Sequence, residues 1–266
     1  MTTRRVVLNG AAAITLLYIL TPLIFVTWLA FFKQEIPSFP PEGYSLRWFK
    51  TILDQPKFVE GFTLSFEVGV LATLFGLLLG VPAALCLTRF RFRGRASLAS
   101  LLLMPLIVPG VVLGTAMYVF EVVAENGLDV DVLGTFYALV AGHIVVVIPW
   151  VVRLVAASLE GVDRTTEEAA QNLGANPLVT FWRITLPAIR PGIVAGALFG
   201  FVVSFGNLEM SLFLVGPGST TLPIVVLQYL EWKIDPTIAA VSVVQIVLIG
   251  LAMLITDRYV KLARVV

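Results

Sequence analysis

One polar stretch separates two long apolar runs of this chain: Thr165-Thr166-Glu167-Glu168-Ala169-Ala170-Gln171-Asn172-Leu173-Gly174-Ala175-Asn176-Pro177. Its residues predict two short helices joined by a sharp turn. Thr165 and Glu168 have the spacing of a capping box, in which a hydroxyl and a carboxylate both accept hydrogen bonds from the backbone at a helix start. Gly174 suits the left-handed position that ends the first helix. The stretch is therefore expected to form a compact helical projection.

The second helix is expected to follow at once. Asn176 can cap it, and Pro177 fits its first position, where a missing N–H costs nothing. It would continue through Phe181-Trp182-Arg183-Ile184-Thr185 and end at Leu186-Pro187. A compact pair of helices held at a membrane surface suits docking into a groove of a partner protein.

The composition is that of a membrane protein. The 266 residues have a mean hydropathy of +0.95 and only 13% are charged, whereas a soluble domain carries about 25%. The net charge of +1 and the absence of a dense basic tract in the sequence argue against a nucleic-acid partner. Cys86 and His143, the single residues of their kinds, lie in apolar runs, so a disulfide within the chain is excluded and a metal site or a catalytic triad has little support. His143 is interpreted as a packing residue rather than a proton relay.

Six apolar runs are long enough to cross a bilayer, which takes about 20 helical residues. We expect the spans at about 10–32, 61–87, 96–122, 132–159, 191–214 and 237–255. The predicted fold is therefore an all-α, polytopic membrane domain that occupies the whole of 1–266. A cleaved signal peptide is the competing interpretation of the first run, but the run is long for one and no clear cleavage site follows.

The segments around these spans have recognisable features. Residues 45–53 resemble a short interfacial amphipathic helix. The third span contains Pro105 and the pair Pro109-Gly110, which predict a kink, and an acidic loop is expected over Glu121–Asp131. The fifth span holds small residues four apart, which favour close packing of helices in lipid. They are Gly192, Gly196 and Gly200.

Lysines and arginines predict which side each loop occupies. With both termini in the cytoplasm, thirteen of the eighteen fall on the inner side: Arg4, Arg5, Arg89, Arg91, Arg93, Arg95, Arg153, Arg164, Arg183, Arg190, Arg258, Lys261 and Arg264. The remaining five fall on the outer side: Lys33, Arg47, Lys50, Lys57 and Lys233. The distribution predicts cytoplasmic termini and a cytoplasmic polar stretch.

The same polar stretch carries a family resemblance. Glu168-Ala169-Ala170, then Gly174, then Ile184-Thr185-Leu186-Pro187 resemble, in residues and spacing, the EAA loop of binding-protein-dependent ABC importer permeases. In that family this loop is the coupling helix that seats in a cleft of a cytoplasmic ATPase. The resemblance implies a type I ABC importer permease in the bacterial cytoplasmic (inner) membrane, with its coupling loop at 160–190. The implied coupling residues are Glu167, Glu168, Ala169, Ala170, Gly174, Ala175, Asn176, Pro177, Arg183, Leu186 and Pro187.

The resemblance also implies the partners. They are two ATPase subunits, a second permease that is identical or homologous, an extracytoplasmic solute-binding protein and the lipid bilayer. The sequence contains no G-x-x-x-x-G-K-[ST] phosphate loop, so ATP and Mg²⁺ are expected on the ATPase subunits. We expect this chain itself to bind no cofactor and to catalyse no reaction.

Within the family, two segments are most similar to the polyamine-type branch: Arg91-Phe92-Arg93-Gly94, and Ser204-Phe205 with Phe213-Leu214-Val215-Gly216-Pro217. That branch implies putrescine, spermidine or a related amine, opine or organic ion as cargo. Gly206-Asn207 stand where polyamine permeases often carry acidic residues, and Glu209 could supply the charge instead. Ionisable groups at bilayer depth are costly, which makes them candidates for a transport pathway. The candidates here are Ser204, Asn207, Glu209 and Ser211.

Several alternatives stay open at this stage. Glu209 could be a structural carboxylate near the outer interface, and Glu67 is interpreted as interfacial. A secondary transporter should show matched broken helices and paired ionisable residues at mid-membrane, and a membrane-embedded enzyme would need a catalytic cluster. The chain could also be the importer subunit for an unrelated substrate, or a packing subunit without a transport path.

Overall fold

The computed structural model describes residues 2–260, with side chains from Arg5 to Arg258. Three side chains in the charge count, Arg4, Lys261 and Arg264, lie outside the described part. Within residues 2–260 the regular elements are helices, apart from one isolated antiparallel bridge between Phe32 and Tyr44. Six helices are long and apolar enough to cross a membrane: Arg5–Leu29, Pro56–Arg89, Gly110–Leu128, Phe136–Glu160, Pro177–Phe205 and Thr237–Arg258. The chain is therefore an all-α, multi-pass membrane protein, as predicted.

The described residues form two compact units. The first consists of the described residues of Met1–Val59 together with Val226–Gly250. The second consists of Glu60–Val225 together with the described residues of Leu251–Val266. The first unit holds α1 (Thr2–Leu29), α2 (Arg47–Asp54) and most of α12 (Thr237–Val260). Its core joins Ala30, Trp48 and Ala240. The Trp48 indole N–H donates to the carbonyl of Phe32 at 2.6 Å, which fixes α2 beside the end of α1. The amphipathic helix expected at 45–53 is thus present, two residues later than predicted.

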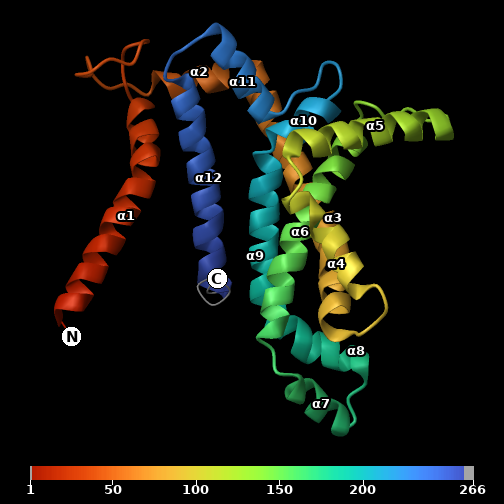
Figure 1. Ribbon diagram of the computed structural model, residues 1–266. Coiled ribbons are helices and arrows are strands. Elements are labelled where there is room, and N and C mark those ends of the chain that lie inside the picture. Colours follow the sequence, from red (N-terminus) through yellow and green to blue (C-terminus); the bar gives the residue numbers. More distant parts are fainter. Residues whose placement is uncertain (1, 261–266) are drawn as a thin grey trace. The chain divides into compact units, whose positions relative to one another are not determined.

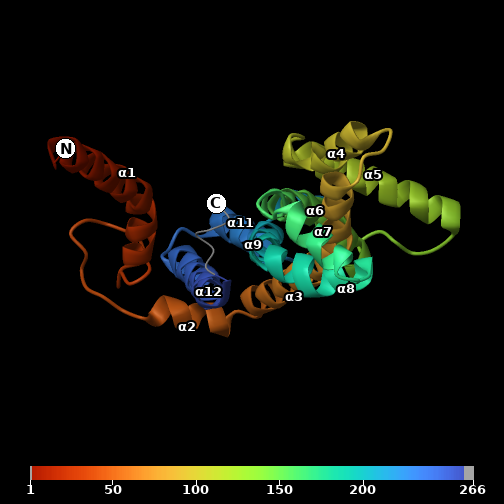
Figure 2. The ribbon, with the colours of Figure 1, turned by 90° about the horizontal axis from the view of Figure 1, so that it is seen from below.

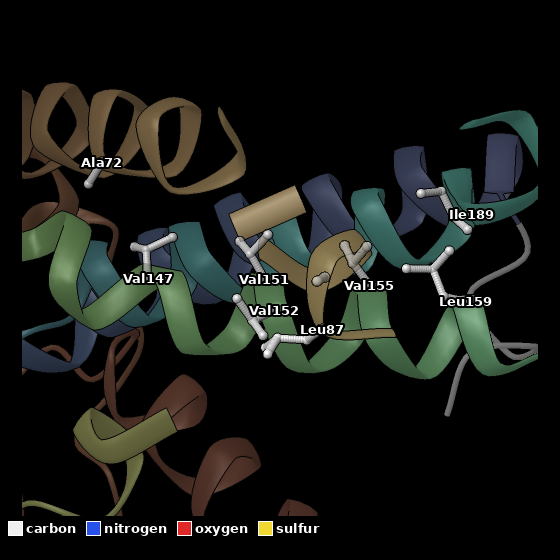
Figure 3. Packing of buried hydrophobic residues seen from close by; sticks show 9 residues of the cluster. Ala72, Leu87, Val147, Val151, Val152, Val155, Leu159 and Ile189 are labelled. Carbon is white, nitrogen blue, oxygen red and sulfur yellow. The ribbon is translucent and has the colours of Figure 1, made fainter. Parts of the chain in front are cut away.

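The second unit is built around α6 (Phe136–Glu160) and α9 (Leu186–Phe205), which run side by side in both views (Figures 1 and 2). Residues spaced four apart share one side of a helix. Figure 3 shows such a row of buried side chains along α6, with Leu87 at the end of α3 (Pro56–Arg89) and Ile189 of α9 packed against it. The row consists of Val147, Val151, Val155 and Leu159. In lipid this packing stabilises the association of the helices through close van der Waals contact rather than through removal of water.

The contact between α6 and α9 needs small residues. A β-carbon added at Gly192 would lie 2.5 Å from the Ser158 Cβ and 2.8 Å from the Leu154 carbonyl oxygen, closer than atoms can approach. Four and eight residues later, Gly196 and Gly200 face Val151 and Val147. The small-residue spacing therefore has the packing role that the sequence predicted.

The third predicted span, 96–122, is wrong as a single helix. The chain forms α4 (Arg95–Leu103), a 3₁₀ turn η1 (Met104–Leu106) and a separate α5 (Gly110–Leu128). Pro109 has an extended backbone at the start of α5 (φ −55°, ψ 135°). A proline also disfavours helical conformation at the residue before it, which here is Val108. Two prolines four residues apart therefore break the helix instead of bending it.

The acidic loop expected over Glu121–Asp131 is also wrong at its start. Helix α5 continues to Leu128, and Asp129 ends it in the left-handed conformation (φ 52°). The carboxylate of Glu125 accepts hydrogen bonds from the backbone N–H groups of Val132 (2.9 Å) and Leu133 (2.8 Å), which closes the following turn. Glu125 thus bonds the backbone of the following turn from within the helix, so its charge did not mark a loop.

The fifth span departs from 191–214 at both ends. Helix α9 begins at Leu186 and ends at Phe205, and a separate helix, α10 (Leu208–Leu214), follows after a break at Gly206. Asn207 starts α10 by accepting a hydrogen bond from the Met210 N–H at 2.8 Å. The helices of the other spans differ from their predicted bounds by up to eight residues, because polar residues next to the apolar runs continue the helices.

Candidate functional site

The polar stretch forms a projection beyond the ends of α6 and α9, at the lower edge of Figure 1. It consists of α7 (Arg164–Asn172), α8 (Pro177–Thr180) and a π-helical turn, η2 (Phe181–Thr185), which runs directly into α9. We call α7, α8 and η2 the helical projection. π turns inside longer helices are rare in proteins, and those that occur are often found at functional sites.

The first helix of the projection begins differently from the prediction. Asp163 caps α7 by accepting a hydrogen bond from the Thr165 N–H at 2.9 Å, and this bond holds the pKa of the Asp163 carboxyl below its ordinary value. The capping box of Thr165 with Glu168 is therefore wrong. An acidic acceptor two residues upstream starts the helix earlier, and Thr165 lies inside it.

The turn between the two helices has the predicted geometry. Gly174 has φ +94°, and its N–H donates to the carbonyl of Gln171 at 2.9 Å. Asn176 caps the second helix by accepting from the Val179 N–H at 2.8 Å, and Pro177 occupies the first turn. Leu186-Pro187 does not end this helix, contrary to the prediction. In the π turn the Leu186 N–H bonds the carbonyl of Phe181, and the helix continues through Pro187 into α9.

The helical projection carries three large apolar side chains that are exposed. Leu173 is 90% exposed, Leu178 67% and Trp182 59%. Glu168 and Arg183 of the projection are exposed as well. Aromatic and arginine side chains with apolar neighbours are the residues that interfaces favour at their centres. The projection therefore has the chemistry of a docking surface.

Polar side chains of the projection also bond to the membrane helices. The carboxylate of Glu167 accepts at one oxygen, Oε1, from the Arg89 guanidinium (3.0 Å) and from the Thr185 hydroxyl (2.8 Å). Arg164 of α7 donates in return to the backbone carbonyl of Arg89, the last residue of α3. A groove of about 350 Å³ lies here, lined among others by Arg89, Arg164, Glu167 and Phe181.

Sequence reasoning did not identify Arg89 or Thr185 as partners of Glu167. In the sequence, Arg89 contributes only to the charge count that predicts orientation. It lies 78 positions before Glu167, and no spacing rule connects residues so far apart. The half-buried Glu167 and the exposed Glu168 are adjacent and chemically alike, so the sequence could not separate their roles.

The candidate pathway residues do not form one group. Ser204 and Ser211 are buried and both bond His143 of α6, at 2.8 Å to Nδ1 and 3.2 Å to Nε2. The Ser211 hydroxyl donates to the carbonyl of Asn207 at 2.7 Å. It must therefore accept from the Nε2–H of a neutral imidazole, and the Ser204 hydroxyl donates to Nδ1. His143 is a hydrogen-bonded residue of the packed interior, as interpreted from the sequence.

Glu209 lies apart from these buried residues. It is exposed at the start of α10, and its side-chain carbons approach the start of α5 at Gly110. Glu67 is exposed on α3. Of the four candidate pathway residues, Glu209 is therefore exposed where α10 approaches α5. The other three form hydrogen bonds within the fold: Ser204, Asn207 and Ser211.

Comparison with known proteins identifies a family. The profile described as "Binding-protein-dependent transport system inner membrane component" matches residues 76–264. The putrescine transport system permease protein PotI of Escherichia coli (strain K12) is 31% identical over 210 residues, covering 79% of this chain and 75% of the relative. The molybdenum transport system permease protein ModB of Mycobacterium bovis is 35% identical over 216 residues, covering 77% and 81%. A crystal structure of a bacterial ABC transporter that imports the acidic polysaccharide alginate has the same fold, with a TM-score of 0.73, 20% identity and 97% of each chain covered.

Proposed function

Since this chain belongs to the family of binding-protein-dependent transport system inner membrane components and is a permease subunit of such an ABC importer, we propose that its helical projection docks onto a cytoplasmic ATPase subunit. The exposed side chains Leu173, Leu178 and Trp182 carry this proposal. These side chains lie outside the packed interior of this chain. A protein partner that covers them would bury them.

The energy source supports the same arrangement. The sequence has no phosphate-binding loop, so ATP and Mg²⁺ would be held by two ATPase subunits. A second permease subunit and an extracytoplasmic binding protein would complete the importer. The excess of arginines in the predicted inner loops supports a bacterial cytoplasmic membrane with both termini and the projection on the cytoplasmic side.

The proposed mechanism follows from how the projection is attached. When the ATPase subunits close on ATP, they would move the projection, and η2 continues without a break into α9. Helix α9 is packed on α6, so the two spans would tilt together and change access to the transport path. This requires that the ATPase binds the two permease states with different affinity.

Two substitutions in the projection test the docking proposal. Gly174→Pro removes the N–H that bonds Gln171 and cannot adopt φ +94°, and Glu168→Arg reverses an exposed charge beside the apolar side chains. Both should abolish uptake in reconstituted vesicles while the protein stays in the membrane. Gly174→Asn and Glu168→Gln are matched controls, because asparagine tolerates the left-handed conformation and glutamine keeps the size of the side chain. Normal uptake by both test variants would contradict docking here.

We further propose a small amine, of the putrescine type, as the cargo. The relative named for putrescine transport supports it, and the exposed Glu209 supplies a carboxylate that could attract an ammonium group. Sequence identity alone does not choose the cargo, because the relative named for molybdenum is 35% identical. A thermal-shift screen of the cognate binding protein with putrescine, spermidine, opines and organic acids tests this. Stabilisation by an anion and not by any amine would contradict the proposal.

A further inference from the structure

Two neighbouring carboxylates of α7 differ in exposure and in bonding. Glu168 is exposed, whereas the side chain of Glu167 is only 15% exposed, although both line the same groove. Only the Glu167 carboxylate has bonding partners from other helices among the described residues. The two therefore act on different structures, one outside the chain and one within it.

Three segments of the chain meet at one oxygen atom. Glu167 Oε1 receives the Arg89 guanidinium from the last residue of α3 and the Thr185 hydroxyl from the residue immediately before α9. The return bond from Arg164 to the Arg89 carbonyl caps the end of α3. Charge-assisted bonds of this kind are short and directional, so they hold α7 in one orientation to both membrane helices.

Apolar packing cannot replace these bonds. In α7, whose nine residues are all described, none is buried. Besides its connections along the chain and its neighbours α8 and η2, α7 is joined to α3 and to Thr185 by these polar side chains. A force applied to α7 by a partner therefore has a route to α3 and the start of α9 through Glu167, in addition to the continuous helix from η2 into α9.

We propose that Glu167, Arg89 and Thr185 form a transmission clasp, a set of positioning residues that converts movement of α7 into movement of α3 and α9. The proposal rests on the docking function proposed above. It separates two tasks within the projection: the exposed apolar side chains hold the ATPase, and the clasp couples its movement to the transport path. Loss of the clasp should leave ATPase binding and ATP hydrolysis intact but lower the amount of cargo taken up per ATP hydrolysed.

The test uses the complete importer in vesicles and measures three quantities: ATPase subunits that co-purify, ATP hydrolysis, and cargo taken up per ATP. Glu167→Gln and Arg89→Gln should keep the ATPase subunits and hydrolysis within about twofold of wild type, and uptake per ATP should fall at least tenfold. Thr185→Val, which removes one hydroxyl at nearly constant volume, should lower uptake per ATP less. The exchanged pair Arg89→Glu with Glu167→Arg should recover much of the loss. Arg91→Gln, an exposed arginine two positions further on, should behave as wild type.

The outcomes separate this inference from the docking proposal. If the wild-type chain binds no ATPase, or Glu168→Arg neither weakens ATPase binding nor lowers uptake, docking is wrong and the clasp fails with it. If docking holds but Glu167→Gln and Arg89→Gln transport with wild-type uptake per ATP, the clasp alone is overturned. It is also overturned if these variants and Thr185→Val lose the ATPase subunits in proportion to uptake, because the residues would then serve only assembly.

Discussion

Helix α9 has a polar cluster at each end, and the two clusters are built differently. Before its first residue, Thr185 joins Glu167 and Arg89 in a charged cluster that is partly open to solvent. At its other end, Ser204 joins His143 and Ser211 in a neutral cluster, in which His143 is only 1% exposed. A charge is strongly penalised where no water reaches it, whereas neutral groups that satisfy one another are tolerated. The comparison indicates that charged groups are used at the end of α9 that is partly exposed, and neutral hydrogen bonds at the end that lies in the packed interior.

The largest expected effect comes from breaking both clusters at once. Gly192→Leu places a side chain where even a β-carbon would lie 2.5 Å from the Ser158 Cβ, so α9 cannot stay against α6. We expect most of the folded protein to be lost, measured as monodisperse material after extraction from the membrane, because an overpacked backbone contact cannot relax. Gly10→Leu is the control, because nothing lies within 4 Å of a β-carbon there. Equal yields of the two variants would show that the α6–α9 contact does not depend on Gly192.

A smaller effect is expected at the neutral cluster alone. His143→Leu removes the partner of two buried hydroxyls, and leaving a buried polar group unsatisfied costs about 1–3 kcal/mol. The thermal unfolding temperature in detergent should fall, without loss of ATPase co-purification. Tyr137→Leu, an exposed position on the same helix, should unfold near the wild-type temperature. An unchanged unfolding temperature for His143→Leu would mean that the neutral cluster does not fix this end of α9.

The smallest effect is a pH dependence confined to the charged end. The hydrogen bond from the Thr165 N–H lowers the pKa of Asp163 in the folded chain below its ordinary 3.8. Its contribution to α7 is therefore complete above pH 3.8 and is lost as the pH falls through the lowered folded value. Hydrogen exchange of the first-turn amides of α7 should quicken relative to the rest of the chain on acidification. Asp163→Asn, which caps without titrating, should show no such change, and an identical response in both proteins would exclude this carboxyl as the source.

Local signals account for what could be predicted from the sequence. The six membrane spans follow from runs of apolar residues, since bilayer thickness sets the length of a helix that crosses it. Gly174 and Asn176 were placed correctly because their roles depend on their own backbone conformation and on atoms within five residues. The same reasoning failed where two local signals compete. Asp163 and Thr165 can both cap α7, and the prolines around 105–109 can kink a helix or break it.

The sequence by itself determined the class of the molecule, the number of its membrane spans and the turn at the centre of its helical projection, because each depends on neighbours along the chain. Only the tertiary structure decided which polar groups meet: Arg89 with Glu167, and His143 with Ser204 and Ser211. These partners lie between 61 and 78 positions apart, and helix packing alone sets the distance between them. Adjacent glutamates can therefore differ in role through nothing more than the direction in which a helix turns them.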